Sequence, residues 1–215
     1  MSYIGRTPTP AALTASDITD GIVSNAKLAQ DIISADTALG ATPADTDEFL
    51  VSDAGTLKRM DYSYIKSTNT PAFEATLASS QTMSDNTNTK IELASETFDV
   101  GGCYDNSTNY RFLPTTAGKY FIYAKGRLQA DQDTDLSQCH LHIYQNGGDK
   151  VASYFLMWVN YVRSITISQS TVIDMDGATD YIELYANVDQ ITGTAPVVIG
   201  GAAGPTLFGA FKLIE

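Results

Sequence analysis

The chain has 215 residues, a hydrophobic fraction of 43% and a formal net charge of −12. That length and composition allow one sizeable all-β domain or two small ones, and they exclude a wholly disordered chain. Acidic residues outnumber basic ones by 25 to 13, and no segment gathers lysine and arginine into a patch, so a function in nucleic-acid binding is disfavoured.

The sequence pattern contains no targeting or membrane signal. Residues 1–8 show no basic start followed by an apolar run, so we predict no secretory signal and expect assembly in the cytoplasm. The longest apolar stretches, near 154–159 and 197–203, are too short to span a bilayer, so we expect no membrane insertion. Cys103 and Cys139 are too few for a disulfide framework. Buried free thiols are predicted, and a disulfide between the two stays possible.

Residues 1–45 are predicted to be an attachment segment with one short helix. Ser24 is placed to cap a helix over 25–33. A helix of about two to three turns is marginal alone in water, so it needs a packing partner. Ile18, Ile22, Ala29 and Ile32 follow a 4-3-4-3 spacing in which Asn25 occupies the position between Ile22 and Ala29. This spacing is typical of a three-stranded coiled segment, but a surface helix lying on another protein also fits, and both interpretations stay open.

Residues 46–72 are predicted to form a stalk hairpin followed by a hinge. Within 47–60, two short strand candidates lie on either side of a turn at Asp53-Ala54-Gly55. An isolated two-stranded ribbon buries too little to be stable, so the hairpin is expected to stack on copies of itself or on a neighbour. The polar segment 67–71 is predicted to be the hinge.

Residues 73–215 are predicted to form an all-β head. Strand candidates recur at turn-separated intervals: 120–124, 139–144, 164–168, 181–185 and 207–214. This spacing is typical of a β-sandwich or barrel. Tyr120 and Ile122 alternate with Phe121 and Tyr123, so both faces of that strand are apolar or aromatic. A sheet with one face exposed to solvent carries polar residues on that face, so the second apolar face is predicted to be an oligomer interface.

The aromatic and glycine spacing of the head resembles the C1q-like branch of the tumour-necrosis-factor-type jelly rolls. The residues that carry the resemblance are Phe98, Tyr104 with Asp105, Phe112, Gly118, Tyr120 and Leu207 with Gly209, together with the segment 176–184. The resemblance implies a trimeric jelly-roll β-sandwich in which these residues form the core or the trimer contact. Ile122 and Ala124 replace the family's aromatics and Leu207 replaces its phenylalanine, so fold and trimerisation are implied more than a shared ligand.

The N-terminal region is similar to openings and stalk units of marine bacteriophage fibre proteins. The similar segments are Tyr3-Ile4-Gly5-x-x-Pro8, 17–29, and 47–53 with Lys58-Arg59. This resemblance implies a virion protein that docks through its N-terminus on other virion proteins. The candidate attachment residues are Tyr3, Ile4, Arg6, Ile18 and Ile22.

The residue types needed for catalysis are scarce. His140 and His142 share one face of a strand, as metal ligands of cupins do, but the chain has no third histidine. The sequence also lacks a Gly-x-Ser-x-Gly motif and a P-loop. We therefore predict no enzymatic activity, no metal and no cofactor.

Two loops are the candidate receptor contacts, because loops at the ends of such folds commonly carry recognition. Their residues are Asp131, Asp133, Asp135, Gly200 and Gly201. The acidic loop lacks the EF-hand glycine and glutamate, so a solvated loop is favoured over a calcium site. Trp158 has the chemistry of a sugar-binding platform, but its aromatic stripe at 154–161 favours a place in the core or at a trimer axis.

Together these features predict a homotrimeric virion structural protein, a tail fibre whose head binds a glycan or protein on the host surface. One alternative is a capsid fibre or decoration protein attached to the shell. A second alternative is a jelly-roll enzyme of the cupin or depolymerase type. The sequence does not separate tail from capsid attachment.

Overall fold

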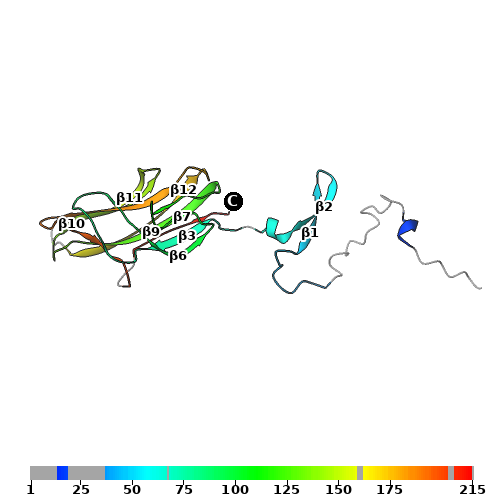
Figure 1. Ribbon diagram of the computed structural model, residues 1–215, viewed down its shortest axis with the longest axis horizontal. Helices are drawn as coiled ribbons and strands as arrows, with labels where there is room; N and C mark the ends of the chain where they lie inside the picture. The colour runs from blue at the N-terminus through cyan, green and yellow to red at the C-terminus, as the bar shows by residue number, and fades with distance from the viewer. Residues whose placement is uncertain (1–13, 19–36, 67, 159–161, 203–205, 215) are drawn as a thin grey trace, which may run out of the picture. The chain divides into compact units, whose positions relative to one another are not determined.

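The computed structural model describes residues 14–18, 37–66, 68–158, 162–202 and 206–214. The chain forms two compact units, Met1–Lys66 and Ser67–Glu215 (Figure 1). The boundary falls at the first residue of the predicted hinge, and the first strand of the second unit begins at Ala72. We call the second unit the head.

The predicted helix over 25–33 and most candidate attachment residues lie outside the described residues. These attachment residues are Tyr3, Ile4, Arg6 and Ile22. Ile18, the remaining one, is exposed and follows a short 3-10 helix, η1 (Ala15–Asp17). None of the helices within the described ranges is long and apolar enough to cross a membrane.

The hairpin predicted over 47–60 is confirmed. Strand β1 (Glu48–Asp53) pairs antiparallel with β2 (Thr56–Asp61). The turn residues Ala54 and Gly55 both have positive φ, 49° and 85°, as a type I′ turn requires. No residue of the two strands is buried, and the 3-10 helix η3 (Tyr62–Tyr64) follows them. The hairpin therefore has little core of its own.

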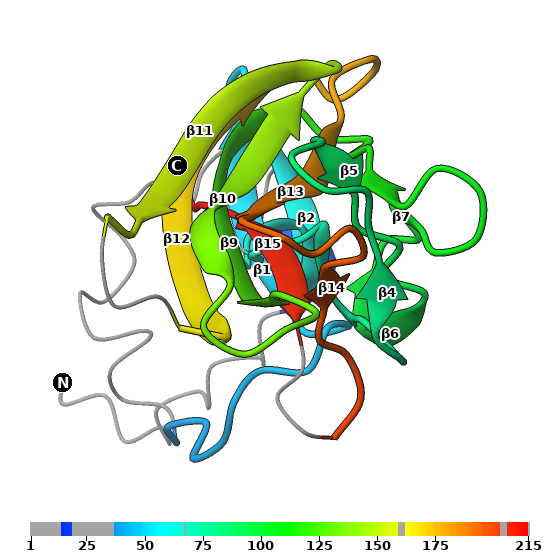
Figure 2. The same ribbon diagram turned by 90° about the vertical axis from the view of Figure 1, so that its left-hand side faces the viewer.

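The head consists of two antiparallel sheets packed face to face, as predicted. The first sheet has the order β11 (Gly148–Leu156), β10 (Leu136–Gln145), β13 (Ile182–Gln190), β8 (Arg111–Phe112) and β7 (Tyr104–Asp105), with β5 (Thr89–Lys90) paired to β13. The second has the order β4 (Gln81–Thr82), β14 (Val197–Val198), β9 (Gly118–Gln129), β15 (Leu207–Lys212), β3 (Ala72–Thr76) and β6 (Ser95–Val100), with β12 (Ser164–Met175) paired to β9. Figure 2 shows β11, β10 and β13 in one layer and β12, β9 and β15 in the other.

The core lies between the two sheets and is centred on stacked aromatic rings. Phe73 is fully buried, and its ring centroid lies 4.5 Å from Tyr104, 4.6 Å from Phe112 and 5.3 Å from Phe208. Such pairs contribute about 0.5–1.5 kcal/mol each beyond the burial of their surface. The Tyr104 hydroxyl donates to the carbonyl of Leu93 at 3.0 Å, so its polar group is satisfied in the core.

The first and last strands of the head are neighbours at the centre of the second sheet. β15 pairs with β3 on one side and with β9 on the other, so Phe211 lies opposite both Ala72 and Phe121. β9 then continues past β15 to Gln129, which pairs with Ser164 of β12. The register therefore defines two ends of the head: an entry end near Ala72, and an opposite end near Gln129.

Candidate functional site

The outward face of the second sheet carries a row of apolar side chains. The strand register places Val100, Ala72, Phe211, Phe121 and Val172 directly across β6, β3, β15, β9 and β12. The rings of Phe121 and Phe211 lie 5.4 Å apart. Val100 and Val172 at the two ends of the row are each 48% exposed. We call this row, together with the parallel row from Phe98 to Ser170 described below, the aromatic face.

The second row of the aromatic face is built around a tyrosine that lies over a glycine. Its members are Phe98, Glu74, Gly209, Tyr123 and Ser170. A Cβ at Gly209 would lie 2.4 Å from both Cζ and Oη of Tyr123, so only glycine lets the ring lie there. The Tyr123 hydroxyl donates to Oε2 of Glu74 at 2.9 Å. Burial, and then this hydrogen bond, raise the pKa of Tyr123 well above its usual range.

A groove of about 480 Å³ runs beside these rows. It is lined by Phe121, Tyr123, Ala124, Lys125, Ser168, Gln169, Ser170 and Leu207. The aromatic face thus combines an apolar row, partly exposed rings and a groove on the side of the sheet that faces away from the core. A contiguous apolar surface of this kind is typical of a protein–protein contact.

The residues of the family-like pattern divide between the core and the aromatic face. Tyr104, Phe112 and Tyr120 are buried in the core. Gly209 lies beneath Tyr123 on the aromatic face. Phe98 is 42% exposed and lies opposite Glu74, so within one chain it belongs to the aromatic face and not to the core.

Turn chemistry explains the remaining residues of the pattern. Asp105 accepts hydrogen bonds from the backbone N–H groups of Thr108 at 2.9 Å and Ser107 at 3.1 Å, which hold the pKa of its carboxyl well below its usual range. Gly118 starts β9 with a φ of 141°, a conformation that favours glycine. A Cβ at Gly118 would lie 2.7 Å from Cε of Lys212.

The acidic loop predicted to contact a receptor lies at the end of the head opposite Ala72. Asp135 is only 4% exposed, and its carboxylate accepts the backbone N–H groups of Thr192 and Gly193 at 3.0 and 2.9 Å. Asp131 similarly accepts the N–H of Thr194 at 3.2 Å. These carboxylates hold the neighbouring loop in place. Asp133 is exposed, and of the three it is the one directed to solvent.

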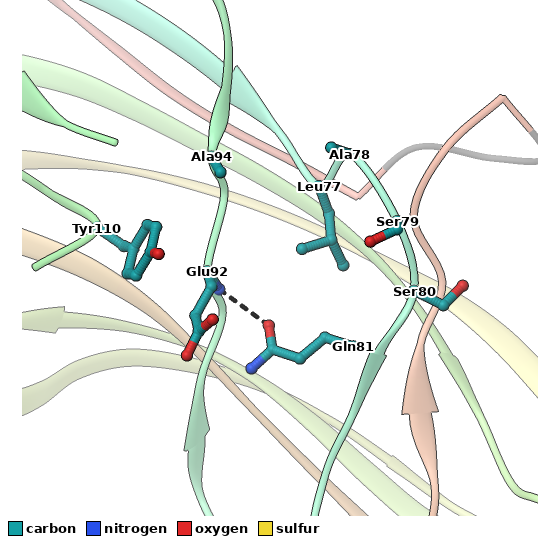
Figure 3. A pocket seen from close by; sticks show the side chains of 8 residues that line it. All are labelled: Leu77, Ala78, Ser79, Ser80, Gln81, Glu92, Ala94 and Tyr110. Carbon is teal, nitrogen blue, oxygen red and sulfur yellow. Dashed lines mark hydrogen bonds between the residues drawn. The ribbon is translucent and has the colours of Figure 1, made fainter. Parts of the chain in front are cut away.

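The glycine loop packs against a different segment. Gly201 donates its N–H to the carbonyl of Leu77 at 2.8 Å, and a Cβ at Gly200 would lie 2.5 Å from the carbonyl oxygen of Ser79. A pocket of about 260 Å³ lies nearby, lined by Leu77, Ala78, Ser79, Ser80, Gln81, Glu92, Ala94 and Tyr110 (Figure 3). Gln81 Oε1 accepts the backbone N–H of Glu92 at 2.9 Å. Glu92 is the single carboxylate among the lining residues, and no histidine, lysine or second carboxylate lies beside it there.

The histidine pair lies on the outward face of the first sheet. The rings of His140 and His142 are 5.6 Å apart, and Tyr154 lies 4.4 Å from His140. His142 is 3% exposed, and its Nδ1 lies 2.9 Å from Oδ2 of Asp149. Burial, and then the neighbouring imidazole, lower the pKa of His140. Within the described part of the chain, no group of three or more histidine, cysteine or acidic side chains is placed to hold a metal.

Trp158 is not in the core of the single chain, so of the two places expected from the sequence, the core and a trimer axis, the core is wrong. It is 84% exposed, just beyond the end of β11, and Tyr154 and Leu156 of the same strand are also exposed. The other part of the predicted stripe, 159–161, lies outside the described residues. Alternation along β11 explains the error, because the even-numbered positions of this strand point away from the core.

Comparisons with known proteins give a likeness of structure only. No protein-family model matches the chain, and no curated protein matches it. A solved structure of Eiger TNF from S. frugiperda is similar over 67% of this chain and 94% of its own, with 9% identity and a TM-score of 0.46. The globular domain of zebrafish complement 1qA is similar over 67% of this chain and 98% of its own, with 11% identity and a TM-score of 0.43.

The strand order of the head decides its class. Two antiparallel sheets face each other, and the last strand lies between the first strand and β9. The head is a jelly-roll sandwich.

Proposed function

We propose that the chain is a homotrimeric, non-enzymatic virion fibre protein. Its aromatic face is buried between subunits, and the loops at the end of the head opposite Ala72 contact the host surface. The observation that carries the proposal is the apolar row that crosses five strands on the outward side of the second sheet. The virion part of the proposal rests on the N-terminal sequence motifs.

The energetic reason for association is the surface that the single chain leaves exposed. Phe98, Val100 and Val172 are each between 42% and 48% exposed. Covering the remaining apolar surface of such a side chain contributes about 1 kcal/mol per residue. Three subunits would also present three copies of a weak host site on one tip, which raises avidity without tight individual contacts.

Light scattering of the full chain on a sizing column tests the assembly. A trimer has three times the 23.1 kDa mass of the chain. Phe211→Glu places a charge in the middle of the apolar row and should give a monomer that keeps its far-UV circular dichroism spectrum. Ile191→Glu, at an exposed apolar position outside the aromatic face, is the matched control and should remain trimeric. A monomeric wild-type chain, or a trimeric Phe211→Glu variant, contradicts the proposed interface.

Immunogold labelling of purified virus particles tests the virion assignment. Label at the tail tip supports the fibre, whereas label spread over the shell identifies the capsid decoration protein. Absence of the chain from particles refutes both. Adsorption of the purified trimer to intact host cells then tests host contact separately.

A further inference from the structure

We propose that a pocket beside Trp158, at the loop-bearing end of the head, binds a neutral saccharide. The pocket has a volume of about 190 Å³ and is lined by Ser137, Gln138, Leu156, Met157, Trp158 and Asp189. We call it the Trp158 pocket. This inference names the ligand class of the proposed host contact and rests on that proposed function.

An aromatic wall is the first element of the site. The Trp158 side chain is 84% exposed, although an indole is among the most apolar surfaces that a protein can present. Leu156 beside it is also exposed. The C–H faces of a pyranose ring pack against an indole ring, while its hydroxyl groups point to the side. A flat aromatic next to a polar recess therefore matches the two-sided chemistry of a sugar.

Paired acceptors at the base of the pocket are the second element. Gln138 and Asp189 are register partners on β10 and β13, and Gln138 Nε2 donates to Asp189 Oδ2 at 2.9 Å. Ser137 Oγ donates to the Asp189 carbonyl at 2.8 Å. The first bond orients the side chains of Gln138 and Asp189, and the second orients the hydroxyl of Ser137. The bond between the two side chains uses Gln138 Nε2 and Asp189 Oδ2, so Gln138 Oε1 and Asp189 Oδ1 are the acceptor atoms offered to a ligand, and adjacent sugar hydroxyl groups are suitable donors for such a pair.

The charge of the site selects the class of saccharide. The lining residues include one carboxylate and no lysine, arginine or histidine. The chain as a whole carries a formal charge of −12. A sialic acid, a uronic acid or a phosphorylated sugar would meet repulsion without a cation to offset it, whereas a neutral hexose unit donates its hydroxyl protons to the acceptors.

The position of the pocket suits a contact with a surface. Within β9, Phe121 lies beside the entry end and Gln129 is the last residue, which places these two residues about 27 Å apart. The chain then passes through the acidic loop to Ser137, whose carbonyl accepts the N–H of Met157 at 2.8 Å. The Trp158 pocket therefore lies at the same end as Asp133, away from the residues through which the chain enters the head.

Trp158 is the single tryptophan of the chain, so its fluorescence reports directly on the pocket. The full-length protein is titrated with the methyl pyranosides of glucose, galactose, mannose and N-acetylglucosamine, and the tryptophan emission is recorded. At least one of these sugars should shift the emission to the blue in a saturable manner. Asp189→Asn should weaken that sugar about tenfold or more, since the charged acceptor is lost. No saturable shift with any of the four sugars overturns the proposal.

Saturation-transfer NMR provides the second readout, because it works without tryptophan. Trp158→Ala should abolish the sugar signal, whereas Tyr64→Ala, at an exposed aromatic in the other unit, should retain it. Each variant is also checked for its mass by light scattering. If Trp158→Ala changes the oligomeric state, the indole serves a subunit contact and the saccharide proposal fails. Host-cell adsorption that is retained by Trp158→Ala refutes this pocket while leaving the fibre function standing.

Discussion

Gly209→Ala should destabilise the head mainly through its contact with the ring of Tyr123. The new Cβ would lie 2.4 Å from Cζ and Oη of that ring and 2.9 Å from the carbonyl oxygen of Phe73. Overpacking of this kind costs about 1–3 kcal/mol. Moving the ring also removes its 2.9 Å hydrogen bond to Glu74, which is worth about 1 kcal/mol. We expect a total loss of about 2–4 kcal/mol in the free energy of unfolding.

A double-mutant cycle separates the ring from the backbone. In a Tyr123→Ala background the close contact with the ring is gone, and only the approach to the carbonyl of Phe73 remains, so Gly209→Ala should cost about 1 kcal/mol there. Urea denaturation of the full chain at one fixed protein concentration, monitored by far-UV circular dichroism, gives the four free energies of unfolding. Tryptophan emission is a poor probe because Trp158 is already exposed in the native state. Equal costs in the two backgrounds would refute the argument, since the strain would then lie in the backbone.

Three further outcomes are expected. Burial lowers the pKa of His140 below its ordinary value of 6.5, so the unfolded chain takes up the proton first. The free energy of unfolding should therefore fall as the pH is lowered through the ordinary value of 6.5. His140→Phe should remove from the pH dependence of the free energy of unfolding a slope of at most about 1.4 kcal/mol per pH unit. An unchanged pH profile in that variant would contradict the role of His140. Burial raises the pKa of Cys139 to about 12, and Cys103 is also buried and free. Ellman's reagent should therefore label both thiols only after denaturation, and rapid labelling of the native protein would disprove this. Lys90→Met leaves the buried Glu183 without the ammonium that lies 2.5 Å away, and should lower the midpoint of urea denaturation by more than Lys150→Met at an exposed position.

The sequence predicted which segments of the head form strands better than it predicted where those strands end. Alternation of Tyr120 and Ile122 with Phe121 and Tyr123 indicated a strand with two apolar faces, and that strand is β9. Its observed end at Gln129 lies well past the predicted 124, because the apolar period continues through Gly126 and Leu128. The period of two is a local property, so it could be read without knowing the fold.

Properties that depend on long-range register could not be read in the same way. The pairing of Gln138 with Asp189 and the placing of Asp131 and Asp135 under the loop at 192–195 join segments far apart in the sequence. Trp158 was expected in the core or at a trimer axis, and the core half of that expectation was wrong because composition alone does not say on which side of a strand a residue lies. The sequence indicated that the second face of β9 is apolar and predicted an oligomer interface there, but the rows of the aromatic face follow only from the pairing of five strands.

The place of β15 between β3 and β9 has a consequence for how the protein is made. The second sheet cannot form completely until β15 (Leu207–Lys212) has been synthesised, because β15 pairs with both β3 and β9 and so joins the first strand of the head to the rest of the sheet. A ribosome that stalls before residue 207 therefore releases a chain with an open seam through the middle of its sheet. Such chains leave β3 and β9 without the strand that they share, so they should be cleaved by proteases more readily than the chain that contains β15.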